Sequence, residues 1–96
     1  MEFADPKLDR LEVDAKFGAG YSDAIVRGFR KVMQSIRAAT DERDLYALKS
    51  LRFEKLKGNR NHQRSLRIND QWRLVVEIEE YNDKHRIRVI GIEDYH

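Results

Sequence analysis

The residues best suited to chemistry lie in a basic segment and in the last few positions of the chain. Residues 49–73 contain eight Lys or Arg and two Asp or Glu, a local net charge of +6, whereas the whole chain carries +2. The chain ends on Ile92-Glu93-Asp94-Tyr95-His96, which places a phenol beside an imidazole. Concentrated positive charge favours an anionic polymer, and adjacent acid–base groups favour proton transfer. The pattern indicates RNA as the favoured substrate.

Cleavage of RNA by its own 2′-hydroxyl sets three tasks, and the candidate residues divide among them. A base must remove the hydroxyl proton, an acid must protonate the leaving 5′-oxygen, and positive charge must stabilise the phosphorus centre. Arg73 is the first candidate for charge stabilisation because a guanidinium presents a planar fork to phosphate oxygens, with Lys57 or Arg60 assisting. Tyr95 and His96 are candidates for proton transfer. Nearby cations lower the pKa of a tyrosine, and a histidine titrates near neutral pH without any shift.

Each of these assignments has a structural alternative that the sequence leaves open. Arg73 could form a surface salt bridge with Glu77 or Glu93 instead of binding phosphate. Tyr95 could close the edge of a sheet, or could stack on a base without moving a proton. His96, as the last residue, could be frayed.

Three arginines of the basic segment are expected to position the RNA backbone: Arg60, Arg64 and Arg67. A metal ion is not expected, because no spacing of His, Asp and Glu resembles a set of ligands. The chain has no cysteine, which excludes disulfides, thiolate metal sites and thiol nucleophiles. No small-molecule cofactor is expected either.

Composition indicates one small domain that spans residues 1–96. With 41% hydrophobic residues, the chain can build one two-layer core. Its apolar runs are far too short for a membrane span, and its acidic first residues do not resemble a signal peptide. We therefore expect a soluble cytoplasmic domain with no membrane partner.

Caps and periodic apolar residues predict a helical first half. Asp5-Pro6 is typical of a helix start, and Ser22 or Asp23 can cap a second, longer helix. The apolar face of that second helix has helical spacing. It consists of Ile25, Phe29, Val32, Met33 and Ile36. Its basic residues, among them Arg30 and Arg37, are expected to form a solvated face, and the two helices to pack as a hairpin.

In the second half the apolar spacing changes to two, which predicts β-strands. The alternating runs are 51–56, 65–68, 72–79 and 86–92. Because the connections between them are short, the strands should pair as antiparallel neighbours. The fold class is therefore α+β, with an N-terminal helical hairpin packed on an antiparallel β-meander sheet. Pairing of the last two strands would bring residues 92–93 beside residues 72–73, at the edge where the chain ends.

Three motifs of this second half resemble those of a known toxin family. They are Leu56-Lys57-Gly58-Asn59-Arg60, Asn69-Asp70-Gln71-Trp72-Arg73 and Glu93-Asp94-Tyr95-His96. Together they closely resemble the HigB branch of the RelE/ParE superfamily, the toxins of bacterial type II toxin–antitoxin pairs. The resemblance implies a RelE-like fold and a metal-independent endoribonuclease that cleaves translated mRNA on the ribosome. It also implies an antitoxin partner that carries a helix-turn-helix DNA-binding domain.

Carried over position by position, the resemblance implies roles around the scissile phosphate for a set of residues. They are Lys57, Arg73, Asp94, Tyr95 and His96. Glu54 is a departure, because members of this family often have a histidine in the strand before the Leu-Lys-Gly motif. Glu54 could act as a base in place of that histidine, or could only pair with a neighbouring cation. Which group is the general base and which is the general acid stays open.

Two other functions are compatible with the same sequence. A non-enzymatic toxin like those of the ParE branch would use this fold to poison DNA gyrase. Such a toxin would not need the basic residues to converge with the acid–base candidates. A plain RNA-binding module would need a base-stacking motif, which the sequence lacks. Convergence of the candidate residues therefore favours the ribonuclease.

Overall fold

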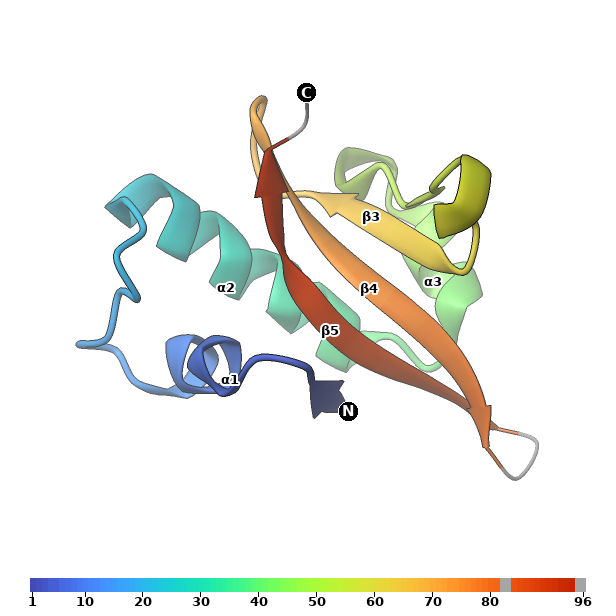
Figure 1. Cartoon of the computed structure of the whole chain (residues 1–96), viewed down its shortest axis with the longest axis horizontal. Helices are drawn as coiled ribbons and strands as arrows, with labels where there is room; N and C mark the ends of the chain where they lie inside the picture. Colours follow the sequence, from blue (N-terminus) through green and yellow to red (C-terminus); the bar gives the residue numbers. More distant parts are fainter. Residues whose placement is uncertain (82–83, 95–96) are drawn as a thin grey trace.

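Apart from a two-residue first strand, the helices precede the strands along the chain, so the predicted α+β class is confirmed (Figure 1). The structure is a computed structural model and describes residues 1–81 and 84–94. The helices are α1 (Pro6–Val13), α2 (Asp23–Ala38) and α3 (Glu42–Ala47). The strands are β1 (Glu2–Phe3), β2 (Glu54–Lys55), β3 (Gln63–Arg67), β4 (Trp72–Tyr81) and β5 (Lys84–Asp94). The 3₁₀ turns η1 (Lys49–Leu51) and η2 (Gly58–Arg60) flank β2.

The first two helices begin where the sequence predicts, at residues that cap free backbone N–H groups. Asp5 accepts a backbone N–H of the first turn of α1 at 2.9 Å, and Pro6 follows where its missing N–H costs nothing. Ser22, rather than Asp23, caps α2 and accepts the backbone N–H of Ile25 at 3.3 Å. Local sequence therefore determines both helix starts.

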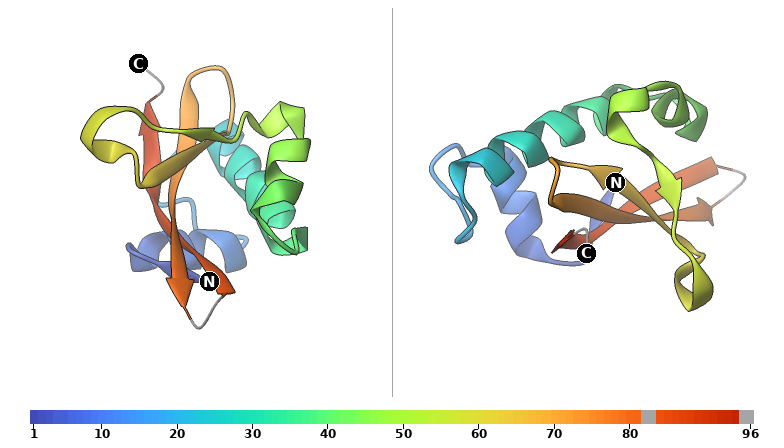
Figure 2. Two further views of the ribbon diagram at one scale, coloured as in Figure 1. Left: turned by 90° about the vertical axis from the view of Figure 1, so that its right-hand side faces the viewer. Right: turned by 90° about the horizontal axis from the view of Figure 1, so that it is seen from above.

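α1 lies across α2, and two arginines of α2 hold it in place (Figures 1 and 2). Arg30 donates from Nε to the Leu11 carbonyl at 3.0 Å and from Nη2 to the Asp14 carbonyl at 2.9 Å. These carbonyls lie at the end of α1, where no helical N–H can reach them. Arg37 forms a two-point ion pair with Glu12, with both N–O distances 2.6 Å. The prediction of a solvated basic face is therefore wrong for Arg30, which is half-buried, whereas Arg37 pairs with Glu12 and stays exposed.

The sheet has the order β1-β5-β4-β3-β2, and its last four strands form the predicted antiparallel meander. β1 was not predicted; its Glu2 and Phe3 pair in parallel with β5. α2 and α3 cover one side of the sheet, the helix face, and η2 lies on the opposite side, the outer face (Figure 2). Directly paired residues share a face, which places a mixed set on the outer face. It includes Glu54, Ser65, Arg67, Arg73, Val75, Glu77, Arg88 and Glu93.

A β-bulge in β5 changes which of its residues point outward. Val76 pairs with Val89, whereas the residue before Val76 pairs with Gly91, so Ile90 is an extra residue in β5. Side chains alternate between the two faces of a strand, and one extra residue inverts that alternation. Beyond the bulge, Glu93 consequently lies on the outer face instead of the helix face.

The predicted strand 51–56 is wrong over most of its length. Lys49–Leu51 form η1, and Arg52 adopts a left-handed backbone with φ 45°. Pairing with β3 begins only at Glu54 and Lys55, and the Leu56 N–H donates to the Gln63 carbonyl at 3.1 Å. Leu51 and Phe53 are nevertheless buried, as the alternating pattern predicts. The predicted alternation of buried residues is therefore present, but a 3₁₀ turn and the left-handed Arg52 produce it instead of a paired strand.

Gly28 allows α2 to approach the sheet closely. A Cβ atom at this position would lie 2.6 Å from Cγ2 of Ile68 and 3.1 Å from the Ile68 carbonyl oxygen. Glycine inside a helix costs about 1 kcal/mol relative to alanine, so packing rather than helix propensity explains it. The core that this contact borders consists of Leu8, Leu11, Val26, Phe29, Val32, Met33, Ile36, Leu45, Leu51, Phe53, Leu66, Leu74, Val76 and Val89.

Candidate functional site

The end of β5 pairs with the start of β4, as the sequence predicts. Arg73 lies directly opposite Glu93, and on its other side it lies opposite Arg67 of β3. All three residues are on the outer face. The Arg73 side chain is 19% exposed, so its guanidinium is partly withdrawn from water although it faces away from the core. This arrangement places two cations and one carboxylate in a single row across three strands.

Glu93 brings a third cation, Arg60, into contact with this row. Arg60 donates to the two carboxylate oxygens of Glu93 at 3.0 and 2.7 Å, and Arg73 lies 3.8 Å from the same carboxylate. We call Arg60, Arg73 and Glu93 the arginine–carboxylate cluster. The hydrogen bonds from Arg60, assisted by the charges of Arg60 and Arg73, hold the pKa of Glu93 below its usual value. Glu93 is therefore ionised at neutral pH.

Lys57 and Glu54 flank the turn from which Arg60 reaches the sheet. Lys57 is the residue before η2 and is exposed, and Gly58 follows it with φ +71°, a left-handed backbone that suits glycine. Glu54 is exposed on the outer face, opposite Ser65. Ser65 and its neighbour Val75 are 2% and 0% exposed although they face away from the helices. The centre of the outer face is therefore shielded from solvent on the side of the sheet where η2 lies.

The arginines expected to position RNA do not share one face. Arg60 and Arg67 are on the outer side of the sheet, where Arg67 pairs with Asp70 of the β3–β4 connection. Arg64 pairs in register with Val76 and so lies on the helix face, where its Nη1 donates to the carbonyls of residues 61 and 63 at 3.0 and 3.3 Å. The structure thus brings Arg60 and Arg67 toward Arg73 and turns Arg64 away from it.

The last motif of the chain is described only in part. Asp94 is exposed, pairs with Trp72, and accepts a hydrogen bond from Nε2 of Gln71 at 3.2 Å. By strand alternation it lies on the side opposite Glu93. The predicted acid–base residues Tyr95 and His96 lie outside the described residues.

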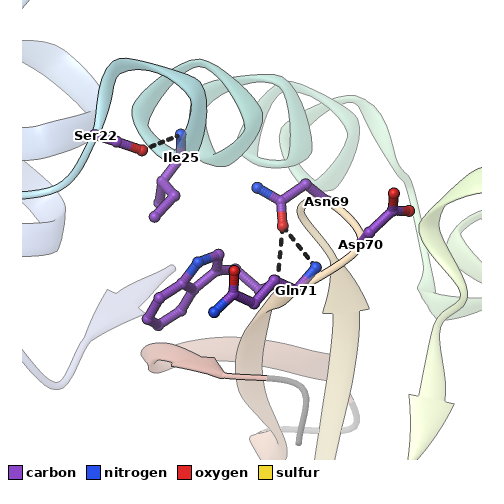
Figure 3. A pocket seen from close by; sticks show the side chains of 6 residues that line it. Ser22, Ile25, Asn69, Asp70 and Gln71 are labelled. Atoms are coloured by element: carbon purple, nitrogen blue, oxygen red, sulfur yellow. Dashed lines mark hydrogen bonds between the residues drawn. The ribbon is translucent and has the colours of Figure 1, made fainter.

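A shallow, open hollow of about 410 Å³ lies between the start of α2 and the β3–β4 connection (Figure 3). Its lining residues are Ser22, Ile25, Asn69, Asp70, Gln71 and Trp72. The Asn69 side-chain oxygen accepts the backbone N–H groups of Gln71 and Trp72 at 2.9 and 2.8 Å, which fixes this connection as a tight turn. Trp72 is half-buried and lines the hollow.

Glu93 is the site residue to which the sequence analysis gave no role beyond pairing with Arg73. Its contact with Arg60 joins positions 33 residues apart, and no periodic pattern reports a contact of that kind. The one sequence feature that could have indicated a role for Glu93 is its place in the motif Glu93-Asp94-Tyr95-His96. In the described ranges, no group of three or more His, Cys, Asp or Glu could hold a metal ion. Likewise, none of the described helices is long and apolar enough to cross a membrane.

Comparison with known proteins identifies the family. Among solved structures, the chain is similar to a YoeB/ParE toxin from Agrobacterium tumefaciens, with a TM-score of 0.54 and 17% identity over 100% of each chain. At this identity the similarity shows the fold. No curated protein sequence matches the chain. Residues 1–91 match the family described as HigB-like toxin, the RelE-like toxin HigB of type II toxin–antitoxin systems. The match includes the first two motifs and ends before the third, and it confirms the predicted family: the chain belongs to the HigB-like toxins of type II toxin–antitoxin systems.

Proposed function

We propose that this toxin is a metal-independent endoribonuclease that cleaves translated mRNA on the ribosome and thereby inhibits translation. The observation that carries the proposal is the position of Arg73. It lies on the outer face, directly opposite Glu93. Glu93 is the residue before Asp94-Tyr95-His96 in the sequence. A partly desolvated guanidinium can stabilise developing charge, and the phenol and imidazole that follow Asp94 in the sequence are suited to proton transfer.

The proposed reaction uses the RNA as its own nucleophile. The 2′-oxygen bonds to the adjacent phosphorus while the bond from phosphorus to the 5′-oxygen breaks. The 2′-hydroxyl proton passes to a general base, and a general acid protonates the departing 5′-oxygen. The products are a 2′,3′-cyclic phosphate and a 5′-hydroxyl end. Because the attack adds negative charge at phosphorus, Arg73 acts most strongly at the transition state, with Lys57 assisting.

The acid–base groups are proposed to come from the end of the chain and from β2. Tyr95, His96 and Asp94 follow Glu93 directly in sequence. Glu54 lies on the outer face in β2 and is exposed, so it is accessible to a substrate bound on that face. One of these groups acts as the general base on the 2′-hydroxyl, and another acts as the general acid on the 5′-oxygen.

A type II toxin implies a cognate antitoxin as its partner. We propose that this antitoxin carries a helix-turn-helix DNA-binding domain, and that the toxin acts in the cytoplasm, where translating ribosomes are found. Arg64 and Arg67 are proposed to contact the RNA backbone, with Arg67 on the same side as Arg73. Arg60, which was expected to join them, has its donors bound to Gln63 and Glu93.

Mapping of mRNA 5′ ends after brief expression of the toxin tests the reaction. We expect new ends within translated regions and in register with the reading frame, and these ends should require phosphorylation before ligation because they carry a 5′-hydroxyl. The Arg73→Ala variant, expressed at the same level, is the control and should give no such ends. A DNA-damage response without cleavage would overturn the proposal. It would favour a gyrase poison, a function that is also compatible with this fold.

A further inference from the structure

The arginine–carboxylate cluster joins a loop to the far side of the sheet. Arg60 belongs to η2, which precedes β3, yet its partner Glu93 is on β5, with β4 between these strands. The Arg60 side chain therefore spans the outer face from the β3 side to β5. Val75 and Ser65, which face outward between them, are buried. The contact fixes η2 over the sheet at one defined position.

Arg60 is held through three of its donor directions. Its Nε donates to the side-chain oxygen of Gln63 at 2.9 Å, and its Nη1 and Nη2 donate to the two oxygens of Glu93. Two-point pairing of a guanidinium with a carboxylate fixes orientation as well as distance. Arg73 contacts the same carboxylate at the longer distance of 3.8 Å. Glu93 therefore binds Arg60 more closely than it binds Arg73.

Lys57 is the residue whose position depends on this contact. It precedes η2 directly, and η2 is a turn of three residues that ends at Arg60. The Asn61 N–H closes the turn by donating to the Gly58 carbonyl at 3.3 Å, so anchoring the end of the turn also restrains its start. Gly58, with its left-handed backbone, sets the direction in which the chain enters the turn. Restraining Arg60 therefore restrains Lys57 relative to β4, the strand that carries Arg73.

We propose that Glu93 is a positioning residue, which latches η2 through Arg60 and so sets the distance between Lys57 and Arg73 across the scissile phosphate. This inference rests on the proposed ribonuclease function. In the complex with RNA, Arg60 stays paired with Glu93, and Arg73 and Lys57 bind the phosphate. Misplacement of a catalytic group by about 1 Å costs up to roughly a hundredfold in rate, so a latch of this kind affects catalysis without touching the substrate.

A double-mutant cycle on Glu93→Gln and Arg60→Gln tests the latch in two independent measurements. The first is amide hydrogen exchange at residues 58–61 of the isolated toxin, which needs no catalytic activity. The second is single-turnover cleavage on programmed ribosomes, corrected for the folded fraction by circular dichroism. Glu12→Gln is the matched control, because it removes a carboxylate that pairs at two points with an arginine far from the site.

Each single variant should exchange these amides at least about tenfold faster and cleave roughly ten- to a hundredfold more slowly, and the double variant should be no worse than the poorer single variant. The Glu12→Gln control should change neither property. Unchanged exchange in Glu93→Gln, or losses of cleavage that multiply in the double variant, would refute the latch. If the wild-type toxin does not cleave RNA, the proposed function fails, and the exchange measurement alone still decides whether the latch exists.

The salt dependence of binding separates a latch from a phosphate contact. Loss of one phosphate contact on a single strand lowers the log–log slope of affinity against salt by about 0.7. Arg60→Gln should leave the slope of ribosome binding unchanged, because in the proposed complex Arg60 remains bound to Glu93. A slope reduced by about that amount would show that Arg60 binds RNA directly and would overturn the proposal.

Discussion

Replacement of Arg73 by alanine is the most direct test of the proposed chemistry. The Arg73 side chain is 19% exposed and lies on the outer face, so its removal opens no cavity in the core between the helices and the sheet. Its cluster partner Glu93 also keeps its two-point pairing with Arg60. The carboxylate is thus not left without a cation, which is the circumstance that makes loss of one ion-pair partner costly. We therefore expect Arg73→Ala to fold with a stability close to that of the wild type.

Catalysis should respond differently, because Arg73 is proposed to act on charge that develops in the transition state. Loss of one such group typically costs about 3–4 kcal/mol, a fall in rate of roughly 10²–10³. Single-turnover cleavage of a message on purified ribosomes measures this rate directly, and thermal unfolding of the same preparation measures stability. Arg88→Ala is a suitable control, since Arg88 is on the same face and forms an ion pair with Glu79 at 3.9 Å.

A specific loss of rate separates the proposed mechanism from a merely structural ion pair. The control variant should cleave at nearly the wild-type rate. If Arg73→Ala also cleaved within a few-fold of the wild type, Arg73 would have no part in the mechanism. If it unfolded at a much lower temperature instead, its role would be structural, and the reasoning from its outward position would be wrong.

Further predictions concern packing, binding and proton transfer. Gly28→Ala should lower stability by about 1–2 kcal/mol in denaturant unfolding, because overpacking against Ile68 exceeds the gain in helix propensity; an unchanged midpoint would contradict the close contact. With about four phosphate contacts, binding to ribosomes should weaken with salt at a log–log slope near −3, and a slope near zero would exclude the basic segment as the RNA face. Tyr95→Phe should lower cleavage by about two orders of magnitude if the hydroxyl transfers a proton, whereas near-full activity would limit Tyr95 to stacking. Glu54→His should preserve or raise the cleavage rate and Glu54→Gln should lower it; equal rates per folded molecule in both variants would make Glu54 structural.

Sequence was a good guide wherever the determining interactions are local. The cap at Asp5 and the apolar periodicity of α2 depend on neighbours within a turn or two, and both predictions are confirmed. The short connections between strands determined the meander and so brought residues 92–93 beside residues 72–73. The exact register was not predicted, because the bulge at Ile90 decides that Glu93 faces outward and pairs with Arg73.

The features that sequence did not predict depend on distant partners. Arg30 has the spacing of a solvated residue, and its role appears only once the end of α1 lies beside it. β1 is a two-residue strand, too short for any periodic signal, and it exists because β5 offers a free edge. Arg60 was expected to bind RNA because it lies in a basic segment. Its pairing with Glu93 requires a folded sheet before the two residues can meet.

The extra residue at Ile90 makes the end of β5 sensitive to chain length in a way that substitutions are not. If β5 lost the bulge without a change of length, Arg73 would pair with Ile92, and Glu93 would turn to the helix face. Deletion of Ile90 would also make the alternation regular, but it would leave Arg73 paired with Glu93. A deletion between the bulge and Glu93, with the bulge retained, would instead bring Asp94 opposite Arg73, and the shorter aspartate would have to reach Arg60. In relatives of this toxin, the spacing between the bulge and the last motif should therefore be constrained more tightly than the identity of the residues that fill it.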